Sequence, residues 1–374
     1  MRIAHFIDTD CKGGAEVTLM DLCTYQKRAG HEVVVIHKDN AFLQQACEQN
    51  GIEQAEIPAH RLYKSTKTLP FYGLSFAKTL RRLRVDVLHS HLFGPITGNA
   101  LPARLSGTRH IGTLHDVYTV EEKPARAKLL ALSHRLGTRL VCVSKHMAEY
   151  YRSQLNTDEK ALGIIYNAAR SPVPLRTEQL RSLRHQYDVA PHETLVIAVG
   201  RLVPLKRQDL IIKALSMTED RDTKLLVVGE GPELGRLRRL AASLAVEARV
   251  IFTGQIADVP ALLQAADLFV QFSSTEGLSR SIIEAMSCRL PCIVSDVGGN
   301  SELVEDQRSG EVVPPDRLDV LIERLNRLVG DPGLRSRYGA QAHERFNQRF
   351  EYERFQRAYL NAYSAPWPQA PSTS

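Results

Sequence analysis

The sequence has no paired cysteine motif, no long apolar run and no internal repeat. Its six cysteines are scattered without a C-x-x-C pair, which fits reduced thiols in a cytosolic protein better than a disulfide framework. The acidic Asp8 comes too early for the apolar core of a signal peptide, and no later stretch approaches 18 uncharged apolar residues. These absences argue against a disulfide-stapled secreted domain and a membrane-spanning chain, and we expect a cytoplasmic protein.

The composition is that of an ordinary globular protein, with 374 residues of which 43% are hydrophobic and 24% charged. This length suggests two domains. A turn-rich stretch with two prolines near residue 170 predicts domains at 1–170 and 171–350, a C-terminal helix at 351–363 and a disordered tail at 364–374. The first 170 residues are the basic part, because they hold 23 Lys and Arg against 16 Asp and Glu.

Short β-rich runs alternate with amphipathic helical stretches in both halves of the chain. We expect strands at residues 3–7, 32–37, 85–89, 110–114 and 140–143, and then at 194–199, 224–228, 249–252, 268–272 and 292–295. Residues 15–29 are an example of an expected helix between strands. This alternation predicts an α/β fold with two Rossmann-like, doubly wound parallel sheets, and a ligand cleft between the two domains.

Two glutamates follow the strand expected to end at Phe272. Glu276 lies in a loop with Gly277 and Leu278, and Glu284 follows in a helix, with seven residues between the two glutamates. Because the carboxyl ends of parallel strands face the ligand crevice, both carboxylates could accept hydrogen bonds from hydroxyls of one ligand. The alternative is one exposed loop glutamate and one glutamate on a helix surface.

Two cations follow the strand expected at 194–199. Arg201 and Lys206 stand just before a helix, where a guanidinium and an ammonium would neutralise a diphosphate without a metal. A solvated basic turn remains open as the alternative.

Two further segments of the first half carry candidate ligand contacts. Gly13 and Gly14 follow the first strand and open the first helix, so that bare backbone N–H groups could approach an anion or a ligand oxygen. His115 follows the strand expected at 110–114 and could bind a sugar or move a proton. A flexible helix entry and a structural histidine are the open alternatives.

Three other patterns imitate binding motifs. Asp8-Thr9-Asp10 and His89-Ser90-His91 resemble metal-ligand pairs, but the local sequence lacks third and fourth ligands, so we expect no metal site. Gly229-Glu230-Gly231 follows a strand but has the wrong spacing for a dinucleotide fingerprint, so we expect a tight turn there.

Taken together, these motifs resemble those of the retaining glycosyltransferases of family 4, which have the GT-B fold. The resemblance covers nearly the whole chain and rests on the pair Glu276 and Glu284, on Arg201 and Lys206, and on the glycines at the start. It also includes the Val228-Gly229-Glu230-Gly231-Pro232, Phe252-Thr253-Gly254 and Val297-Gly298-Gly299 segments.

The resemblance implies a role for each motif residue. Arg201 and Lys206 would hold the donor diphosphate, Glu284 the nucleotide ribose and Glu276 the transferred sugar. The backbone amides of Gly277 and Leu278 would assist at the sugar and phosphate, the Gly13-Gly14 segment would lie near the diphosphate, and His115 would contact the sugar. We expect the catalytic residues to be His115, Glu276, Arg201 and Lys206. The family usually needs no metal, so we expect no cofactor beyond a nucleotide-sugar co-substrate, with a UDP-sugar as the first expectation.

Three departures from the family pattern affect these roles. The family often has Lys-Gly where this chain has Lys206-Arg207, Gly-x-Pro where it has Ser279-Arg280-Ser281, and Asn-Gly-Val-Asp where it has Asn167-Ala168-Ala169-Arg170. Arg280 matters most because it adds a cation near the sugar site. It could alter the choice of donor or point to solvent.

The expected reaction moves a hexose or aminohexose from the nucleotide sugar to a glycan or lipid-linked acceptor, with its anomeric configuration kept, in lipopolysaccharide, capsule or exopolysaccharide synthesis.

The expected membrane contact rests on basic residues of two predicted helices: Lys78, Arg81, Arg82 and Arg84 on one, and Lys123, Arg126, Lys128 and Arg135 on the other. These favour peripheral contact with the inner face of the anionic cytoplasmic membrane, with a solvated helix face as the alternative. No recognised module indicates nucleic-acid binding. A GT-B-like epimerase or phosphorylase and a non-catalytic sugar-nucleotide-binding protein are the alternatives to a transferase.

Overall fold

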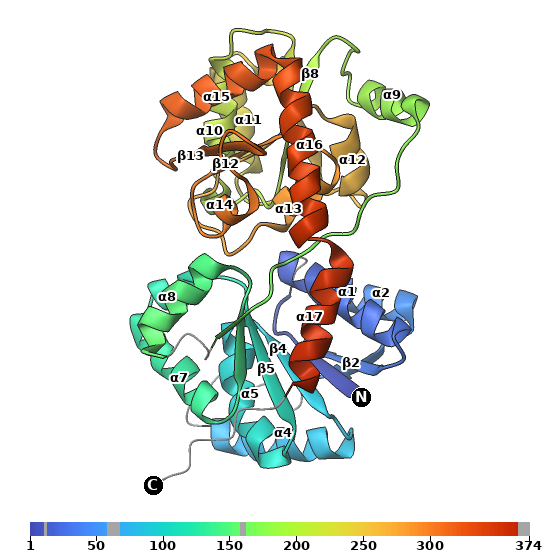
Figure 1. The fold of residues 1–374 in the computed structure, drawn as a ribbon, viewed down its shortest axis with the longest axis vertical. Coiled ribbons are helices and arrows are strands. Elements are labelled where there is room, and N and C mark those ends of the chain that lie inside the picture. Colours follow the sequence, from blue (N-terminus) through green and yellow to red (C-terminus); the bar gives the residue numbers. More distant parts are fainter. Residues whose placement is uncertain (11–12, 58–67, 158–161, 366–374) are drawn as a thin grey trace. The chain divides into compact units, whose positions relative to one another are not determined.

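The computed structural model describes residues 1–10, 13–57, 68–157 and 162–365. The chain divides into two compact units (Figure 1). The first comprises Met1–Tyr166 together with the segment from Phe355 onward, and the second comprises Asn167–Arg354. Of the tail predicted at 364–374, Ser364 is the last residue of a helix, and residues 366–374 lie outside the described part of the chain.

The first unit is built on a seven-stranded parallel sheet in the order β3-β2-β1-β4-β5-β6-β7. Its strands are β1 (Arg2–Phe6), β2 (Glu32–His37), β3 (Glu53–Glu56), β4 (Val87–His91), β5 (Arg109–Leu114), β6 (Arg139–Cys142) and β7 (Leu162–Ile164). The helices packed with it are α1 (Gly14–Arg28), α2 (Ala41–Asn50), α4 (Leu69–Arg82), α5 (Phe93–Ser106), α6 (Tyr118–Glu121), α7 (Ala127–Arg135), α8 (Lys145–Leu155) and the C-terminal α17 (Tyr352–Ser364).

Alternate residues of β2 enter two different cores, one on each face of the sheet. Val34 and Ile36 pack with Phe76 of α4, whereas Val33 and Val35 pack with Leu19 of α1. A strand covered by helices on both faces favours apolar residues on both, and this is why residues 33–36 of β2 are all apolar. The sheet is therefore doubly wound, as the sequence predicted.

The second unit contains a six-stranded parallel sheet in the order β10-β9-β8-β11-β12-β13. Its strands are β8 (Thr194–Val199), β9 (Thr223–Val228), β10 (Val250–Gly254), β11 (Leu268–Gln271), β12 (Cys292–Ser295) and β13 (Gly310–Val313). Its helices are α9 (Thr177–Gln186), α10 (Gln208–Ser216), α11 (Leu234–Ser243), α12 (Val259–Ala265), α13 (Arg280–Ser287), α14 (Asn300–Leu303), α15 (Leu318–Gly330) and α16 (Pro332–Arg349). One apolar core joins strands to helices, with Leu268, Leu215 and Leu325 all completely or almost completely buried.

The sequence did not predict three of the strands, and each of them is the outermost strand of a sheet. β3 and β7 are the two edges of the first sheet, and β13 is an edge of the second. Edge strands need to be neither long nor apolar, and β3 reads Glu-Gln-Ala-Glu.

Candidate active site

Strands β8 and β11 are neighbours in the middle of the second sheet, and their carboxyl ends lie side by side. The strand order reverses here, because the chain runs outward from β8 to β9 and β10 and then returns to β11 on the other side. Ligands of doubly wound sheets bind at such a point. The loop after β8 carries Arg201 and Lys206, and the loop after β11 carries Glu276.

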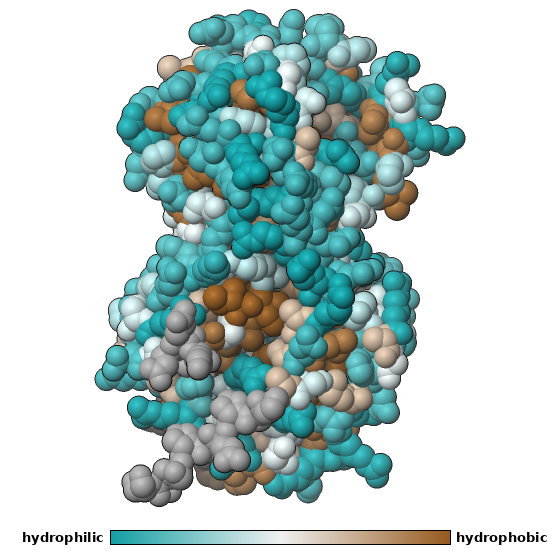
Figure 2. Space-filling model, in the orientation of Figure 1, coloured by the Kyte–Doolittle hydropathy of each residue, from teal (hydrophilic) through white to brown (hydrophobic). Residues whose placement is uncertain are grey.

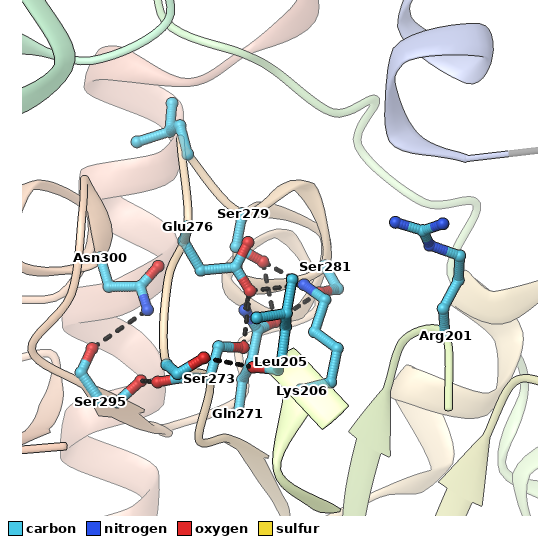
Figure 3. A network of polar contacts seen from close by, with 12 residues as sticks. Arg201, Leu205, Lys206, Gln271, Ser273, Glu276, Ser279, Ser281, Ser295 and Asn300 are labelled. Carbon is cyan, nitrogen blue, oxygen red and sulfur yellow. Dashed lines mark hydrogen bonds and ion pairs between the residues drawn. The ribbon is translucent and has the colours of Figure 1, made fainter. Parts of the chain in front are cut away.

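The Glu276 carboxylate is the centre of a polar network (Figure 3). Its Oε1 accepts hydrogen bonds from Gln271 Nε2 at 2.7 Å and from the Ser273 hydroxyl at 2.6 Å, and it forms an ion pair with Lys206 Nζ. Only 11% of the Glu276 side chain is exposed. Within the described part of the chain, Oε2 has no hydrogen-bond partner, so one oxygen of a fixed carboxylate stays available to a ligand.

Gln271, at the end of β11, is a site residue that the sequence reasoning missed. Its Oε1 accepts hydrogen bonds from the hydroxyls of Ser279 at 2.8 Å and Ser281 at 2.7 Å, while its Nε2 donates to Glu276. The two serines that depart from the family pattern are thereby tied to Glu276 through one amide. The available signal was a polar residue ending an otherwise apolar buried strand.

Glu284 lies one turn after the start of α13 and pairs with Arg280. Arg280 Nε donates to Glu284 Oε1 at 2.8 Å, and both side chains are largely buried. The cation that the sequence left unplaced therefore contacts the carboxylate expected at the ribose.

Arg201 stands apart from these pairs. Its side chain is exposed, and among the described residues it has no ion-pair or hydrogen-bond partner. In Figure 3 it lies apart from the network around Glu276. Its loop is supported from behind, because Leu202 N donates to the Glu230 carbonyl at 2.8 Å. A Cβ at Gly229 would come within 2.1 Å of the Gly200 carbonyl oxygen, so the Gly229-Glu230-Gly231 segment is a tight turn packed against the Arg201 loop.

The backbone after Glu276 is held by a close approach at Gly298. This residue has φ +55°, and a Cβ there would stand 1.7 Å from the Glu276 carbonyl oxygen. Gly299 N donates to the Gly277 carbonyl at 3.1 Å, and Asn167 Nδ2 donates to the Leu278 carbonyl at 3.0 Å. The N–H groups of Gly277 and Leu278 themselves have no acceptor in the described ranges, so both can serve a ligand.

The remaining expected residues lie at the carboxyl edge of the sheet in the first unit. Gly13 precedes α1 and Gly14 is its exposed first residue; residues 11–12, just before them, are outside the described part. His115 follows β5, two strands from β1. Its Nε2 lies 3.3 Å from His91 Nδ1, and burial lowers the pKa of the imidazole to about 4. His115 is therefore neutral near pH 7.

The pair His89 and His91 gains a third histidine that no local pattern indicated. His5 lies on the neighbouring strand β1, and the nitrogens of the three rings lie within 4.8 Å of one another. Asp8 and Asp10, the other metal-like pair, belong to no such group among the described residues. Both His89 nitrogens already have partners, Tyr363 at 2.8 Å and Thr113 at 2.7 Å.

Comparison with known proteins identifies the type of chain. Residues 12–170 match the model of Glycosyltransferase Family 4, and residues 181–345 match that of Glycosyl transferases group 1. Among curated relatives, N-acetyl-alpha-D-glucosaminyl L-malate synthase of Bacillus anthracis is 26% identical, over 94% of this chain and 93% of its own. UDP-Gal:alpha-D-GlcNAc-diphosphoundecaprenol alpha-1,3-galactosyltransferase of Escherichia coli is 26% identical, over 73% of each chain.

Solved structures agree in fold. Anabaena Alr3699/HepE in complex with UDP and glucose superposes with a TM-score of 0.86 at 22% identity, covering 97% of this chain and 99% of that one. WaaG, a glycosyltransferase involved in lipopolysaccharide biosynthesis, gives a TM-score of 0.75 at 18% identity, covering 97% and 100%. The GT-B architecture predicted from the sequence is confirmed, and the chain belongs to glycosyltransferase family 4.

Proposed function

We propose that this protein is a retaining, metal-independent glycosyltransferase that moves a hexose or aminohexose from a UDP-sugar to a glycan or lipid-linked acceptor. The process it serves is the synthesis of a lipopolysaccharide, capsule or exopolysaccharide. The observation that carries the proposal is the Lys206–Glu276 pair, held at the carboxyl ends of β8 and β11, with Arg201 on the same loop as Lys206.

The donor diphosphate binds Arg201 and Lys206. Arg201 offers a guanidinium that no described residue pairs with, and the Lys206 ammonium keeps further N–H donors after its contact with Glu276. These charges balance the negative charge that grows on the leaving diphosphate, which is the part a metal ion plays in other transferases.

The transferred sugar binds Glu276 through Oε2, with the N–H groups of Gly277 and Leu278 beside it. The Glu284 carboxylate accepts hydrogen bonds from the ribose hydroxyls, while Arg280 Nε donates to its Oε1. The resemblance to family 4 also assigns His115 to the sugar and the Gly13-Gly14 segment to the diphosphate. Retention is the outcome implied by the family.

The names of relatives support the class of donor and acceptor. One is named as a synthase of N-acetyl-alpha-D-glucosaminyl L-malate, one is named with UDP-Gal and alpha-D-GlcNAc-diphosphoundecaprenol, and one solved neighbour is described with UDP-glucose. These names share sugars of the hexose and aminohexose class, and two of them share UDP.

A lipid-linked acceptor would place the enzyme at a membrane, and α4 has a suitable surface. Phe71 and Leu74 are 68% and 64% exposed, and Lys78, Arg81 and Arg82 continue the same helical face. Helices α4 and α7 both pack against α5. On α7, Leu129 and Leu132 are exposed beside Lys128 and Arg135. Hydrophobic residues are also visible on the first unit in Figure 2. Exposed apolar side chains next to cations fit an anionic bilayer surface.

Two structural findings qualify this membrane contact. The second basic cluster was expected on one helix, and this prediction is wrong, because Lys123 and Arg126 precede α7. Lys123 precedes a 3-10 turn, Pro124–Arg126, in which Arg126 is the last residue before α7 begins at Ala127. None of the described helices is long and apolar enough to cross a bilayer.

Release of UDP from a UDP-sugar tests the proposed reaction. We expect release that depends on an added glycan or lipid-linked acceptor, with the sugar recovered in α linkage on the acceptor. Epimerised UDP-sugar, sugar 1-phosphate formed with inorganic phosphate, or donor binding without turnover would each contradict the proposal.

A further inference from the structure

One face of the first sheet carries a row of histidines. The register pairs His5 of β1 with His89 of β4, and His91 of β4 with Thr113 of β5. Because registered partners and alternate residues of a parallel sheet share a face, these side chains point the same way, and His115 continues the row beyond β5. Helices α1 and α17 lie beside this sheet (Figure 1). Their side chains Gln26, Tyr359 and Tyr363 form hydrogen bonds with residues of this face.

Three of these histidines form a continuous hydrogen-bonded chain that starts at Gln26. Gln26 Oε1 lies 2.8 Å from His5 Nε2, His5 Nδ1 lies 3.1 Å from His91 Nε2, and His91 Nδ1 lies 3.3 Å from His115 Nε2. The ring planes of successive histidines differ by only 22° and 25°. Their centroids are 5.4 and 5.6 Å apart, so the rings meet edge to edge through their nitrogens.

All three rings are neutral near pH 7. Burial lowers the pKa of His5 to about 4 and that of His115 to about 4, and burial lowers the pKa of His91 well below its ordinary value. A neutral imidazole has one N–H and one acceptor nitrogen. Each ring can therefore donate in only one direction along the chain, and the direction of the first bond determines all the others.

The side-chain amide of Gln26 gives that direction. Its Nε2 donates to the Tyr363 hydroxyl at 3.2 Å, which directs Oε1, an acceptor only, toward His5. His5 must then carry its hydrogen on Nε2 and accept at Nδ1. By the same reasoning His91 donates from Nε2 to His5, and His115 donates from Nε2 to His91.

We propose that Gln26 is a positioning residue that fixes His115 as its Nε2–H tautomer through His5 and His91. The Nδ1 of His115 then keeps its lone pair, and among the described residues it has no partner. It accepts a hydrogen bond, so it selects a ligand group that donates one, such as a sugar hydroxyl or an acetamido N–H, over a phosphate oxygen. Only the identification of this ligand as the donor sugar rests on the proposed function; the tautomer does not.

The same residues are less suited to a metal site. The rings of His89 and His91 stack face to face, with centroids 4.0 Å apart and planes inclined by 29°. Imidazole lone pairs lie in the ring planes, so two stacked rings do not direct theirs at one ion. His5 and His91 also use their facing nitrogens to bind each other.

Nuclear magnetic resonance of the histidine rings tests the proposal without any substrate. In the full-length protein labelled with ¹⁵N at histidine, long-range ¹H–¹⁵N spectra report which ring nitrogen carries the hydrogen. We expect His115 as a single Nε2–H tautomer at pH 7. Gln26→Met removes the amide with little change of volume, and Tyr363→Phe removes the acceptor that orients it. Each should give a mixture of His115 tautomers, and two variants allow for failure of one to fold.

His110→Gln is the matched control, because His110 is equally buried on the opposite face of the sheet and binds Ser90 and Thr138 instead. It should leave the His115 tautomer unchanged. An Nδ1–H tautomer in the unaltered protein, an unchanged tautomer in both variants, or stoichiometric zinc in the purified protein would overturn the proposal.

Kinetics separate this proposal from the proposed function. Loss of one correctly directed hydrogen bond should lower kcat/KM of Gln26→Met for the UDP-sugar roughly 2- to 10-fold. A changed tautomer with unchanged kcat/KM would uphold control of the His115 ring by Gln26 and refute its contact with the donor sugar.

Discussion

Lys206 and Glu276 are 70 residues apart in the sequence and form an ion pair where two neighbouring strands of one sheet end. Gln271 and Ser273 bind the same carboxylate oxygen, so Glu276 cannot turn without losing three contacts. The cation proposed for the diphosphate and the carboxylate proposed for the sugar therefore have a defined mutual position. Such preorganised charges lower the free energy of a transition state more than groups that must reorient.

Removal of the Lys206 ammonium should reduce turnover and leave the fold intact. We expect Lys206→Ala to lower kcat roughly 100- to 1000-fold, because the leaving diphosphate loses one of its charge partners. Steady-state assays of UDP release measure this, with the melting temperature as a check on folding. Lys213→Ala is the control, since Lys213 is more exposed and lies on α10 in a weak 3.9 Å pair with Asp209. Normal turnover by a folded Lys206→Ala protein would refute the role.

A side chain at Gly298 should disturb the Glu276 loop. Gly298→Ala places a methyl group 1.7 Å from the Glu276 carbonyl oxygen at a φ of +55°, so the loop must move. We expect a loss of at least about 1 kcal/mol in the free energy of unfolding, together with reduced activity.

Gly330→Ala is the matched substitution, because no atom lies within 4 Å of its added Cβ, at the end of α15. It should be neutral or slightly stabilising. Urea unfolding compares the two proteins, and equal stability would show that the loop does not depend on Gly298.

The buried histidines should make the first unit sensitive to acid. Burial lowers the pKa of His5 to about 4 and that of His110 to about 3, from an ordinary value of 6.5. Above pH 6.5 neither the folded nor the unfolded state takes up protons at these rings. As the pH falls from 6.5 toward 4 only the unfolded state does, and stability falls by up to about 1.4 kcal/mol per pH unit for each such ring.

Calorimetric melting between pH 7.5 and pH 5 measures this slope. His110→Gln removes one of the titrating rings, and its stability should change less steeply with pH than that of the unaltered protein. A melting temperature that stays constant from pH 7.5 to pH 5 would contradict neutral burial of the histidines.

Vesicle binding should depend on the exposed apolar residues of α4. With vesicles containing phosphatidylglycerol, the double substitution Phe71→Ser and Leu74→Ser should weaken binding by at least about tenfold, because two apolar side chains lose their place in the bilayer surface. Val173→Ser is the control, since Val173 is 82% exposed but belongs to the second unit. Co-sedimentation measures binding. Equal binding to neutral phosphatidylcholine vesicles would argue against the proposed contact.

The sequence was sufficient for the central strands and for the residues that end them. Strands such as β2 and β8 contain apolar runs, at residues 33–36 and 195–199, and Arg201, Lys206 and Glu276 follow soon after predicted strands. Edge strands such as β3 lack this signal, because an edge strand has a neighbouring strand on one side only and need not be apolar.

The contacts between distant segments were beyond the reach of local patterns. Gln271 binds Ser279 and Ser281 only because β11 and α13 pack together, and Gln26 meets His5 because α1 lies over β1. The pair His89-Ser90-His91 was visible in the sequence. Its third member, His5, required the register of β1 on β4.

Calorimetric titration, without added metal, of the purified protein with UDP, GDP, ADP and their common hexose conjugates tests the central claim most directly. We expect UDP and one UDP-hexose or UDP-aminohexose to bind, and Glu284→Ala to weaken that binding by at least about tenfold through loss of charge-assisted hydrogen bonds to the ribose. Glu323→Ala, at an exposed carboxylate of α15, should bind as the unaltered protein does. Binding of no member of the panel, or binding that Glu284→Ala leaves unchanged, would contradict the account.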